Sequence, residues 1–140
     1  MSETQTLSYA KALAATRLHI YQVLFSISII VGLVVGLWCI FDPVGFAQLL
    51  FQTDPHPQTW PRIWGATVLA LQVLYIPGVR NPVFNRWPNW SSIAVKLLMT
   101  IIFLTAGSSF YLLAVWEFVW FIILFVTYYR LVLADMQSNP

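Results

Sequence analysis

The sequence predicts an all-α fold, an integral membrane bundle of four helices. Composition is the first reason: 59% of the 140 residues are hydrophobic and only 9% are charged, whereas soluble domains carry about 25% charged residues. The second is that four apolar runs, each about as long as a membrane is thick, are separated by segments rich in proline, glycine and asparagine. Together they indicate a single transmembrane domain over residues 1–140.

The first spanning helix is predicted at about residues 20–41, after a polar start and a helix-forming segment at 7–20. About 20 apolar residues suffice to cross the hydrocarbon core. Gly32 and Gly36 lie four residues apart, a spacing of small residues that lets another helix approach closely. That helix can belong to this bundle or to another protein, and the sequence leaves both open.

Residues 42–61 form the longest predicted loop, which begins where Pro43 ends the first helix. Within it, residues 44–51 are apolar with helical spacing and predict a short interfacial or re-entrant helix. Asp54 and His56 follow in a proline-rich stretch. A metal pair there is far less expected than an exposed loop, because a zinc site needs more ligands than these.

The second span is predicted at about 62–77, where Pro77 and Gly78 are expected to stop it. Arg62 stands at its start, close to the tryptophans expected at a membrane interface. Across the preceding loop, Asp42 is expected to pair with Arg62.

The third and fourth spans, at about 91–107 and 110–131, form a tight hairpin. Each carries one ionisable residue, Lys96 in the first and Glu117 in the second. Counted along each helix from the turn, Lys96 and Glu117 lie at depths that differ by only about one helical turn, at a rise of about 1.5 Å per residue. Because a lone charge in hydrocarbon is costly, Lys96 and Glu117 are predicted to form a buried polar pair.

Two interpretations of this pair stay open, a structural ion pair that sets helix register and a polar centre for a ligand or a proton. The other candidate ligand-lining residues are Gln72, Tyr75, Thr100 and His19. His19 stands near the predicted cytoplasmic end of the first span, where it could serve as a general acid or a quinone ligand. An interfacial histidine without such a role is the commoner case.

The familiar catalytic motifs are missing from the sequence: it has no HExxH zinc motif, no phosphate-binding glycine loop and no nucleophile elbow. Its single cysteine, Cys39, allows no intrachain disulfide and no cysteine-based metal site. We therefore predict no metal and no cofactor. A net charge of +2 gives no reason to expect a nucleic-acid partner.

Lysine and arginine predict the orientation. The N-terminal arm, the segment after the second span and the C-terminal tail hold most of them: Lys11, Arg17, Arg80, Arg86 and Arg130. The 42–61 side holds only Arg62. Since short cytoplasmic flanks are enriched in positive charge, both termini are predicted to be cytoplasmic, with the 42–61 loop outside.

Three short segments resemble the DoxX-like small membrane proteins: 41–43 (Phe-Asp-Pro), 62–65 (Arg-Ile-Trp-Gly) and 81–82 (Asn-Pro). The outline is also similar to that of the Erg28-like scaffold proteins. The first resemblance implies a four-helix protein of the bacterial inner membrane, and the second implies a scaffold for other membrane enzymes. Neither implies an active-site residue.

Taken together, these observations favour a non-catalytic accessory or scaffold subunit of a membrane complex. Its expected partners are membrane lipids and either a membrane protein or further copies of the chain. The alternative is a lipid- or quinone-binding protein, or a small membrane isomerase or oxidoreductase subunit, that uses Lys96 and Glu117. A transporter or channel is a weaker third hypothesis, because no inverted repeat is visible.

Overall fold

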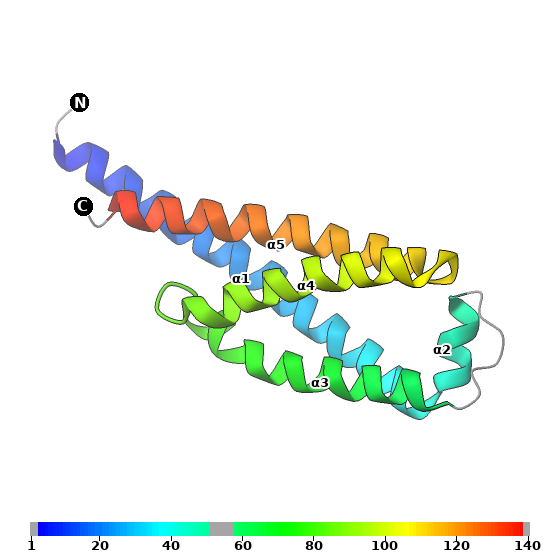
Figure 1. Ribbon diagram of the computed structural model, residues 1–140. Coiled ribbons are helices and arrows are strands. Elements are labelled where there is room, and N and C mark those ends of the chain that lie inside the picture. Colours follow the sequence, from blue (N-terminus) through cyan, green and yellow to red (C-terminus); the bar gives the residue numbers. More distant parts are fainter. Residues whose placement is uncertain (1–2, 51–57, 139–140) are drawn as a thin grey trace.

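The computed structural model describes residues 3–50 and 58–138, and side chains from residue 8 onward. This part of the chain is helical and contains no strand. Its α-helices are α1 (Glu3–Phe41), α2 (Pro43–Leu49), α3 (Thr59–Arg80), α4 (Arg86–Ala106) and α5 (Tyr111–Ser138) (Figure 1). The predicted all-α class is confirmed for these residues.

The four long helices form a closed ring. α1 packs against α3 and α5, and α4 packs against the same two helices. Both chain termini lie at one end of the bundle, which we call the terminal end, and α2 lies at the other, which we call the α2 end (Figure 1). Every long helix therefore contributes one face to a shared interior.

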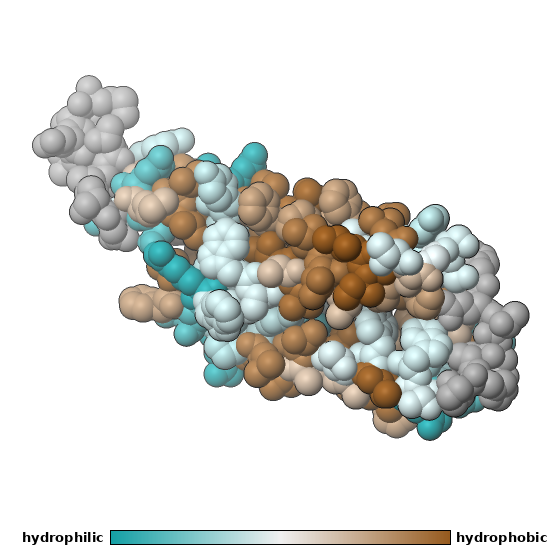
Figure 2. Space-filling model, viewed as in Figure 1, coloured by the Kyte–Doolittle hydropathy of each residue, from teal (hydrophilic) through white to brown (hydrophobic). Residues whose placement is uncertain are grey.

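All four long helices are long and apolar enough to cross a membrane. Each also exposes large apolar side chains, including Ile30, Leu74, Leu98 and Val119, which are 48–65% exposed. Figure 2 shows apolar side chains over the middle of the bundle and hydrophilic ones gathered near the terminal end. Exposing such an apolar surface to water would cost free energy, whereas contact with the lipid chains of a bilayer would not.

The 7–20 segment is continuous with the first span within α1, one of the two arrangements open to it. The other long helices extend beyond the predicted spans: α3 runs from Thr59 through Pro77 to Arg80, α4 begins at Arg86 instead of 91, and α5 ends at Ser138 instead of 131. Pro77 is tolerated because, in the last turn, it removes only one backbone hydrogen bond. Its own carbonyl accepts from Asn81 N and from Asn85 Nδ2.

The connection from α1 to α3 contains the expected short helix, which is α2. Asp42 caps it: Oδ1 accepts a hydrogen bond from Gly45 N at 3.0 Å, and Oδ2 accepts one from Trp38 Nε1 at 3.3 Å. Among the described residues no ion pair joins Asp42 to Arg62, so that expectation is wrong. Arg62 instead donates to Gln58 Oε1 at 3.4 Å. Asp54 and His56 lie outside the described residues.

α1 and α3 approach closely at glycines. A Cβ on Gly65 would lie 2.6 Å from Gly36 O, and one on Gly36 would lie 3.0 Å from Gly65 O. A Cβ on Gly32 would meet the side chain of Gln72 at 2.6 Å. Gly32 and Gly36 thus serve a contact inside the bundle, with Gly65 as the partner that the sequence analysis did not single out.

The hairpin between α4 and α5 turns at Gly107, which has φ = 118°. Residues with a Cβ rarely adopt this conformation. A short 3-10 turn, Ser108–Phe110, follows directly and leads into α5. This tight reversal keeps α4 and α5 antiparallel, with matching depths side by side.

A buried asparagine holds the terminal end together. Asn89 is 0% exposed; its Oδ1 accepts from Tyr21 Oη at 2.9 Å, and its Nδ2 donates to the carbonyls of Pro82 and Asn85 at 3.1 and 2.9 Å. Tyr128 Oη donates to the same Pro82 carbonyl at 3.2 Å. Asn89 therefore links α1 and α4 to the segment that follows α3, and Tyr128 joins α5 to the same segment.

Replacing Asn89 with leucine is expected to lower the free energy of unfolding by about 1–3 kcal/mol. The variant leaves the Tyr21 hydroxyl and the Pro82 carbonyl with fewer buried partners, and such groups carry a desolvation cost of that size. Thermal unfolding in detergent micelles measures the change. Asn81→Leu, at an exposed asparagine of the same segment, is the control, and an equal loss in both variants would contradict the role given to Asn89.

Candidate functional site

A cavity of about 290 Å³ lies inside the half of the bundle nearer to α2. All four long helices and α2 contribute to its walls. The α1 and α2 side is formed by Ser28, Val31, Gly32, Val35, Trp38, Phe46, Leu49 and Leu50. The rest is formed by Trp64, Thr67, Val68, Leu71, Gln72, Tyr75, Val95, Lys96, Met99, Leu112, Leu113, Trp116, Glu117 and Trp120. Its volume is at the lower end of the range of small-molecule pockets.

Some of the lining side chains are also exposed on the outside of the bundle, among them Trp38 (39%), Leu49 (50%) and Leu112 (51%). Toward the terminal end, the bundle is filled by a buried cluster made of Tyr21, Phe25, Ile29, Tyr75, Ile93, Leu124, Tyr128 and Leu131. This cluster therefore bounds the cavity on the terminal side.

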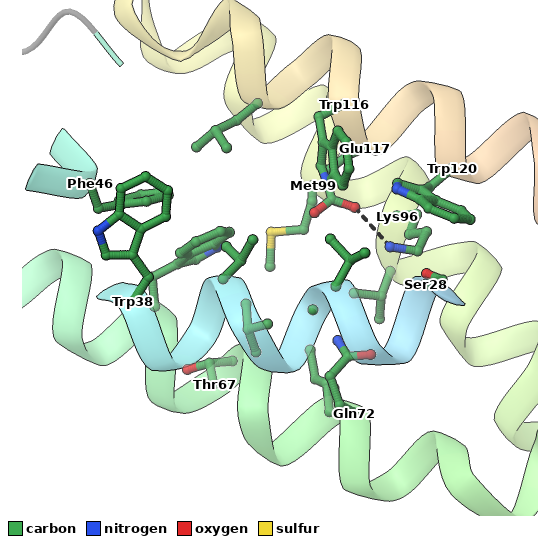
Figure 3. A pocket seen from close by; sticks show the side chains of 18 of the residues that line it. Ser28, Trp38, Phe46, Thr67, Gln72, Lys96, Met99, Trp116, Glu117 and Trp120 are labelled. Carbon is green, nitrogen blue, oxygen red and sulfur yellow. Dashed lines mark hydrogen bonds and ion pairs between the residues drawn. The ribbon is translucent and has the colours of Figure 1, made fainter. Parts of the chain in front are cut away.

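The two charged residues that were predicted to pair meet in the cavity wall. Lys96 Nζ lies 3.2 Å from Glu117 Oε2, and both side chains are 13% exposed. Figure 3 shows the pair beside Ser28, Met99 and Trp120. Lys96 is the central residue of the 21-residue helix α4, so the pair sits about halfway through the bundle. Charges midway along membrane-spanning helices are expected to be paired or to face a water-filled cavity, and these two are paired.

α3 presents one continuous stripe to the cavity. Trp64, Val68, Leu71, Gln72 and Tyr75 all line it, and their spacing of three and four residues places them on one face of a helix. Along this stripe, the apolar side chains of Val68 and Leu71 are followed by the polar side chains of Gln72 and Tyr75. The cavity thus has apolar walls along its length and hydrogen-bonding groups near the ion pair.

Two donors in this wall lack a partner within the described protein. Tyr75 Oη and Trp64 Nε1 are buried atoms that make no hydrogen bond. The Tyr75 side chain is only 5% exposed, and its ring lies 6.0 Å from that of Phe25. Both atoms have almost no accessible surface, so neighbouring side chains enclose them, and neither faces the open space of the cavity; Ser92 Oγ, outside the cavity lining, is a third buried atom of this kind.

The structure brings only some of the candidate residues together. Gln72 and Tyr75 line the cavity with the ion pair, and so does Gly32. Thr100 does not line it; its Oγ1 donates to the backbone carbonyl of Lys96 at 2.8 Å. His19 is exposed on α1, outside the cavity, so it is removed from the candidate ligand-lining set.

Other lining residues were missed by the sequence analysis, notably Trp64 and Ser28. Trp64 was interpreted as an interfacial anchor, although it begins the stripe on α3 that ends at Tyr75. That helical spacing was the available signal. Phe46 and Leu50 of the α2 region could not be assigned, because nothing in the sequence says against which helices α2 folds back.

The described residues contain no group of three histidine, cysteine, aspartate or glutamate side chains that could hold a metal ion. Comparison of the chain with protein-family models, with curated proteins and with solved structures found no match. The resemblance to the DoxX-like and Erg28-like proteins therefore stays a prediction.

Proposed function

We propose that this chain is a multi-pass membrane protein that binds an amphipathic molecule of the lipid or quinone class in the cavity. One observation supports this most strongly: the cavity places a buried ion pair next to apolar walls. Such a site matches a ligand with one polar end and one apolar end. Ligand pockets generally combine predominantly apolar walls with a few placed polar groups.

A purely structural ion pair would not need this cavity. Packed side chains normally fill the space around buried charges, because interiors are close-packed and voids cost free energy. Here the pair borders about 290 Å³ of space. The ligand-site interpretation of Lys96 and Glu117 therefore has more support than the structural one.

We further propose that both termini are cytoplasmic and that the membrane is the bacterial inner membrane. The support for the orientation is the charge distribution, and the choice of membrane follows the resemblance to the DoxX-like proteins. Lys11, Arg17, Arg80, Arg86 and Arg130 lie toward the terminal end, and Arg62 lies toward the α2 end. By the positive-inside rule the α2 end is extracytoplasmic. The cavity would then lie in the half of the bundle nearer to the outer leaflet.

An accessory or scaffold subunit is the hypothesis that the sequence favoured, and it stays a prediction. One argument for the scaffold hypothesis, the one from the two glycines of α1, is weakened. Gly32 and Gly36, offered as contact points for a partner, pack against α3 of the same chain. A ligand-binding subunit within a larger complex is compatible with both proposals.

Filling the cavity is the direct test. Val68 lines it, and Val68→Phe would occupy part of the space. We expect lipid extracted from the purified variant to contain at least about fivefold less of any molecule that is present in near-stoichiometric amount with the wild type. Quantitative mass spectrometry of solvent extracts measures this.

The control is Val73→Phe, the same substitution on α3 at a residue that is 59% exposed and does not line the cavity. It is expected to keep the wild-type lipid content. If wild type, Val68→Phe and Val73→Phe carry the same lipids in the same ratios to protein, the proposed function is wrong.

A further inference from the structure

We propose that the terminal end of the bundle binds the head of an anionic phospholipid, through arginines gathered around the connection between α3 and α4. The group recognised is a phosphodiester anion that carries acyl chains. Arg80 and Arg86 are the central residues of this site, with Arg17 and Arg130 on the neighbouring helices. The site lies on the outer surface of the bundle, apart from the cavity, and therefore goes beyond the proposed function.

The four arginines lie at one level of the bundle, and we call them the arginine belt. Each is two to four residues along the chain from a member of the hydrogen-bond network around Asn89, whose other members are Tyr21, Pro82 and Tyr128. That separation is at most about one helical turn, or about 6 Å along a helix axis. The belt therefore surrounds the level at which this network joins the helices.

The connection from α3 to α4 brings Arg80 and Arg86 to the same edge of the bundle. Asn85, the residue before α4, donates from Nδ2 to the carbonyl of Pro77 at 3.1 Å and from its backbone N to the carbonyl of Asn81 at 2.9 Å. These bonds hold the start of α4 against the last turn of α3. Arg80 ends α3 and Arg86 begins α4, so the two arginines flank this joint.

Both arginines are available to a ligand. The guanidinium group of Arg80 is exposed and makes no hydrogen bond or ion pair with the described residues. Arg86 donates from Nε to the carbonyl of Val83 at 3.1 Å, and its Nη2 lies 3.8 Å from Asp135 Oδ2. The Arg86 side chain is still 53% exposed. Guanidinium groups bind phosphate oxygens through short, charge-assisted hydrogen bonds.

The depth of the connection matches that of lipid heads. Phe84 and Trp87, which lie within it and just after it, are 84% and 81% exposed, and aromatic side chains are enriched at membrane–water interfaces. Along α3, twenty residues separate Trp60 from Arg80, which is about 30 Å at a rise of about 1.5 Å per residue. Since the hydrocarbon core is about 30 Å thick, Trp60 and Arg80 fit its two surfaces.

Charge at this level is unbalanced. Among the acidic side chains that the structure describes, Asp42 caps α2 and Glu117 pairs with Lys96, so only Asp135 lies near the arginine belt. Figure 2 shows hydrophilic side chains gathered near this end. Four arginines with one nearby carboxylate complement an anionic head, whereas a zwitterionic head brings its own cation. Basic sites between helices at a membrane surface are suited to anionic lipids.

The test uses Trp87, which follows Arg86 directly and is 81% exposed. The full-length protein is reconstituted into bilayers of phosphatidylglycerol and phosphatidylcholine in equal amounts and with the same acyl chains. Bromine atoms, which quench tryptophan fluorescence, are carried by the phosphatidylglycerol in one preparation and by the phosphatidylcholine in the other, so the surface charge is the same in both. The signal of Trp87 is the difference between each protein and its Trp87→Phe counterpart.

We expect brominated phosphatidylglycerol to quench Trp87 more strongly, with an enrichment over phosphatidylcholine of at least about fivefold, the value for one arginine near a lipid surface. Arg80→Gln/Arg86→Gln is expected to reduce this enrichment to less than about twofold. Equal quenching of wild-type Trp87 in the two preparations overturns the proposal, and so does an enrichment that the double variant retains.

Lys11→Gln/Arg62→Gln is the control with matched charge. It also removes two positive charges, but Lys11 lies six residues beyond Arg17 on α1, and Arg62 lies toward the α2 end. We expect it to keep the wild-type enrichment. A loss as large as in Arg80→Gln/Arg86→Gln would mean that net charge, and not the site, selects the lipid, and the proposal would be wrong.

Two further measurements do not depend on the contacts of Arg86. Arg80→Gln alone removes a guanidinium group without a partner among the described residues, so folding is expected to be unchanged and the enrichment to fall about two- to fivefold. In the wild type, raising the ionic strength from about 0.01 M to about 1 M shortens the Debye length from about 30 Å to about 3 Å, and most of the enrichment should disappear. An enrichment that neither change reduces overturns the proposal.

The arginine belt and the cavity can fail independently. The belt is on the surface, so its lipid is expected to exchange with the bilayer and to be replaced by detergent. A molecule retained through extraction and purification therefore reports on the cavity, and the bilayer measurement at Trp87 reports on the belt.

Discussion

Replacing Glu117 alone with leucine is expected to cost about 3–5 kcal/mol of stability, because it leaves the ammonium group of Lys96 buried without its partner. In the wild type the two groups lie 3.2 Å apart and are each 13% exposed. The free energy of unfolding in detergent, or the temperature of half-unfolding, measures the loss. Lys96→Met is expected to have an effect of similar size.

The double variant Lys96→Met/Glu117→Leu is the control for this prediction. Apolar residues of similar volume often replace a buried ion pair without loss of stability. We therefore expect the double variant to be within about 1 kcal/mol of the wild type. A double variant as unstable as Glu117→Leu would show that the pair is not the reason for the loss.

Gly65→Ala is the second substitution with a large expected effect, a loss of about 1–3 kcal/mol from overpacking. The new Cβ would lie 2.6 Å from Gly36 O and 2.8 Å from Cys39 Cβ. A backbone oxygen cannot move without the whole helix, so α1 and α3 must separate. Thermal unfolding in detergent measures the effect.

Gly32→Ala is the matched comparison on the same helix contact. Its Cβ would also lie 2.6 Å from another atom, but that atom belongs to the flexible amide end of Gln72. The amide can rotate away, so the loss should be clearly smaller than in Gly65→Ala. If Gly32→Ala is the more damaging of the two, the close α1–α3 contact is not where the structure places it.

The glycines also change what a mutation can show about partners. Substitution of Gly32 and Gly36 by leucine would seem a test of partner capture. Because both lie against α3, such a variant is expected to disturb the bundle itself. Loss of a partner in that variant would not distinguish a scaffold from a ligand-binding protein.

Much of the fold follows from local patterns in the sequence. Apolar runs of membrane length predicted the four long helices, and the short break around Gly107 predicted the hairpin between α4 and α5. A matched depth in an antiparallel hairpin was enough to expect that Lys96 and Glu117 would meet. The passage of α3 through Pro77 was not anticipated, since the sequence alone does not show whether a proline ends a helix or lies within its last turn.

The cavity could be predicted only in part. Gln72 and Tyr75 were candidates because they are polar residues in an apolar run. The packing of α2 and the role of Trp64 depend on how five helical segments meet, and periodicity within one segment does not carry that information. For the same reason Asn89, central to the terminal end, was not a candidate.

Native mass spectrometry of the protein, extracted gently from its own membrane, tests the central claim most directly. The wild type is expected to retain one small lipid-class molecule per chain. The folded double variant Lys96→Met/Glu117→Leu is expected to lose it, because the polar end of the cavity is gone. A wild type that carries a stoichiometric protein partner and no small molecule, or a bound molecule that the double variant retains, would contradict the claim that this cavity is a ligand site.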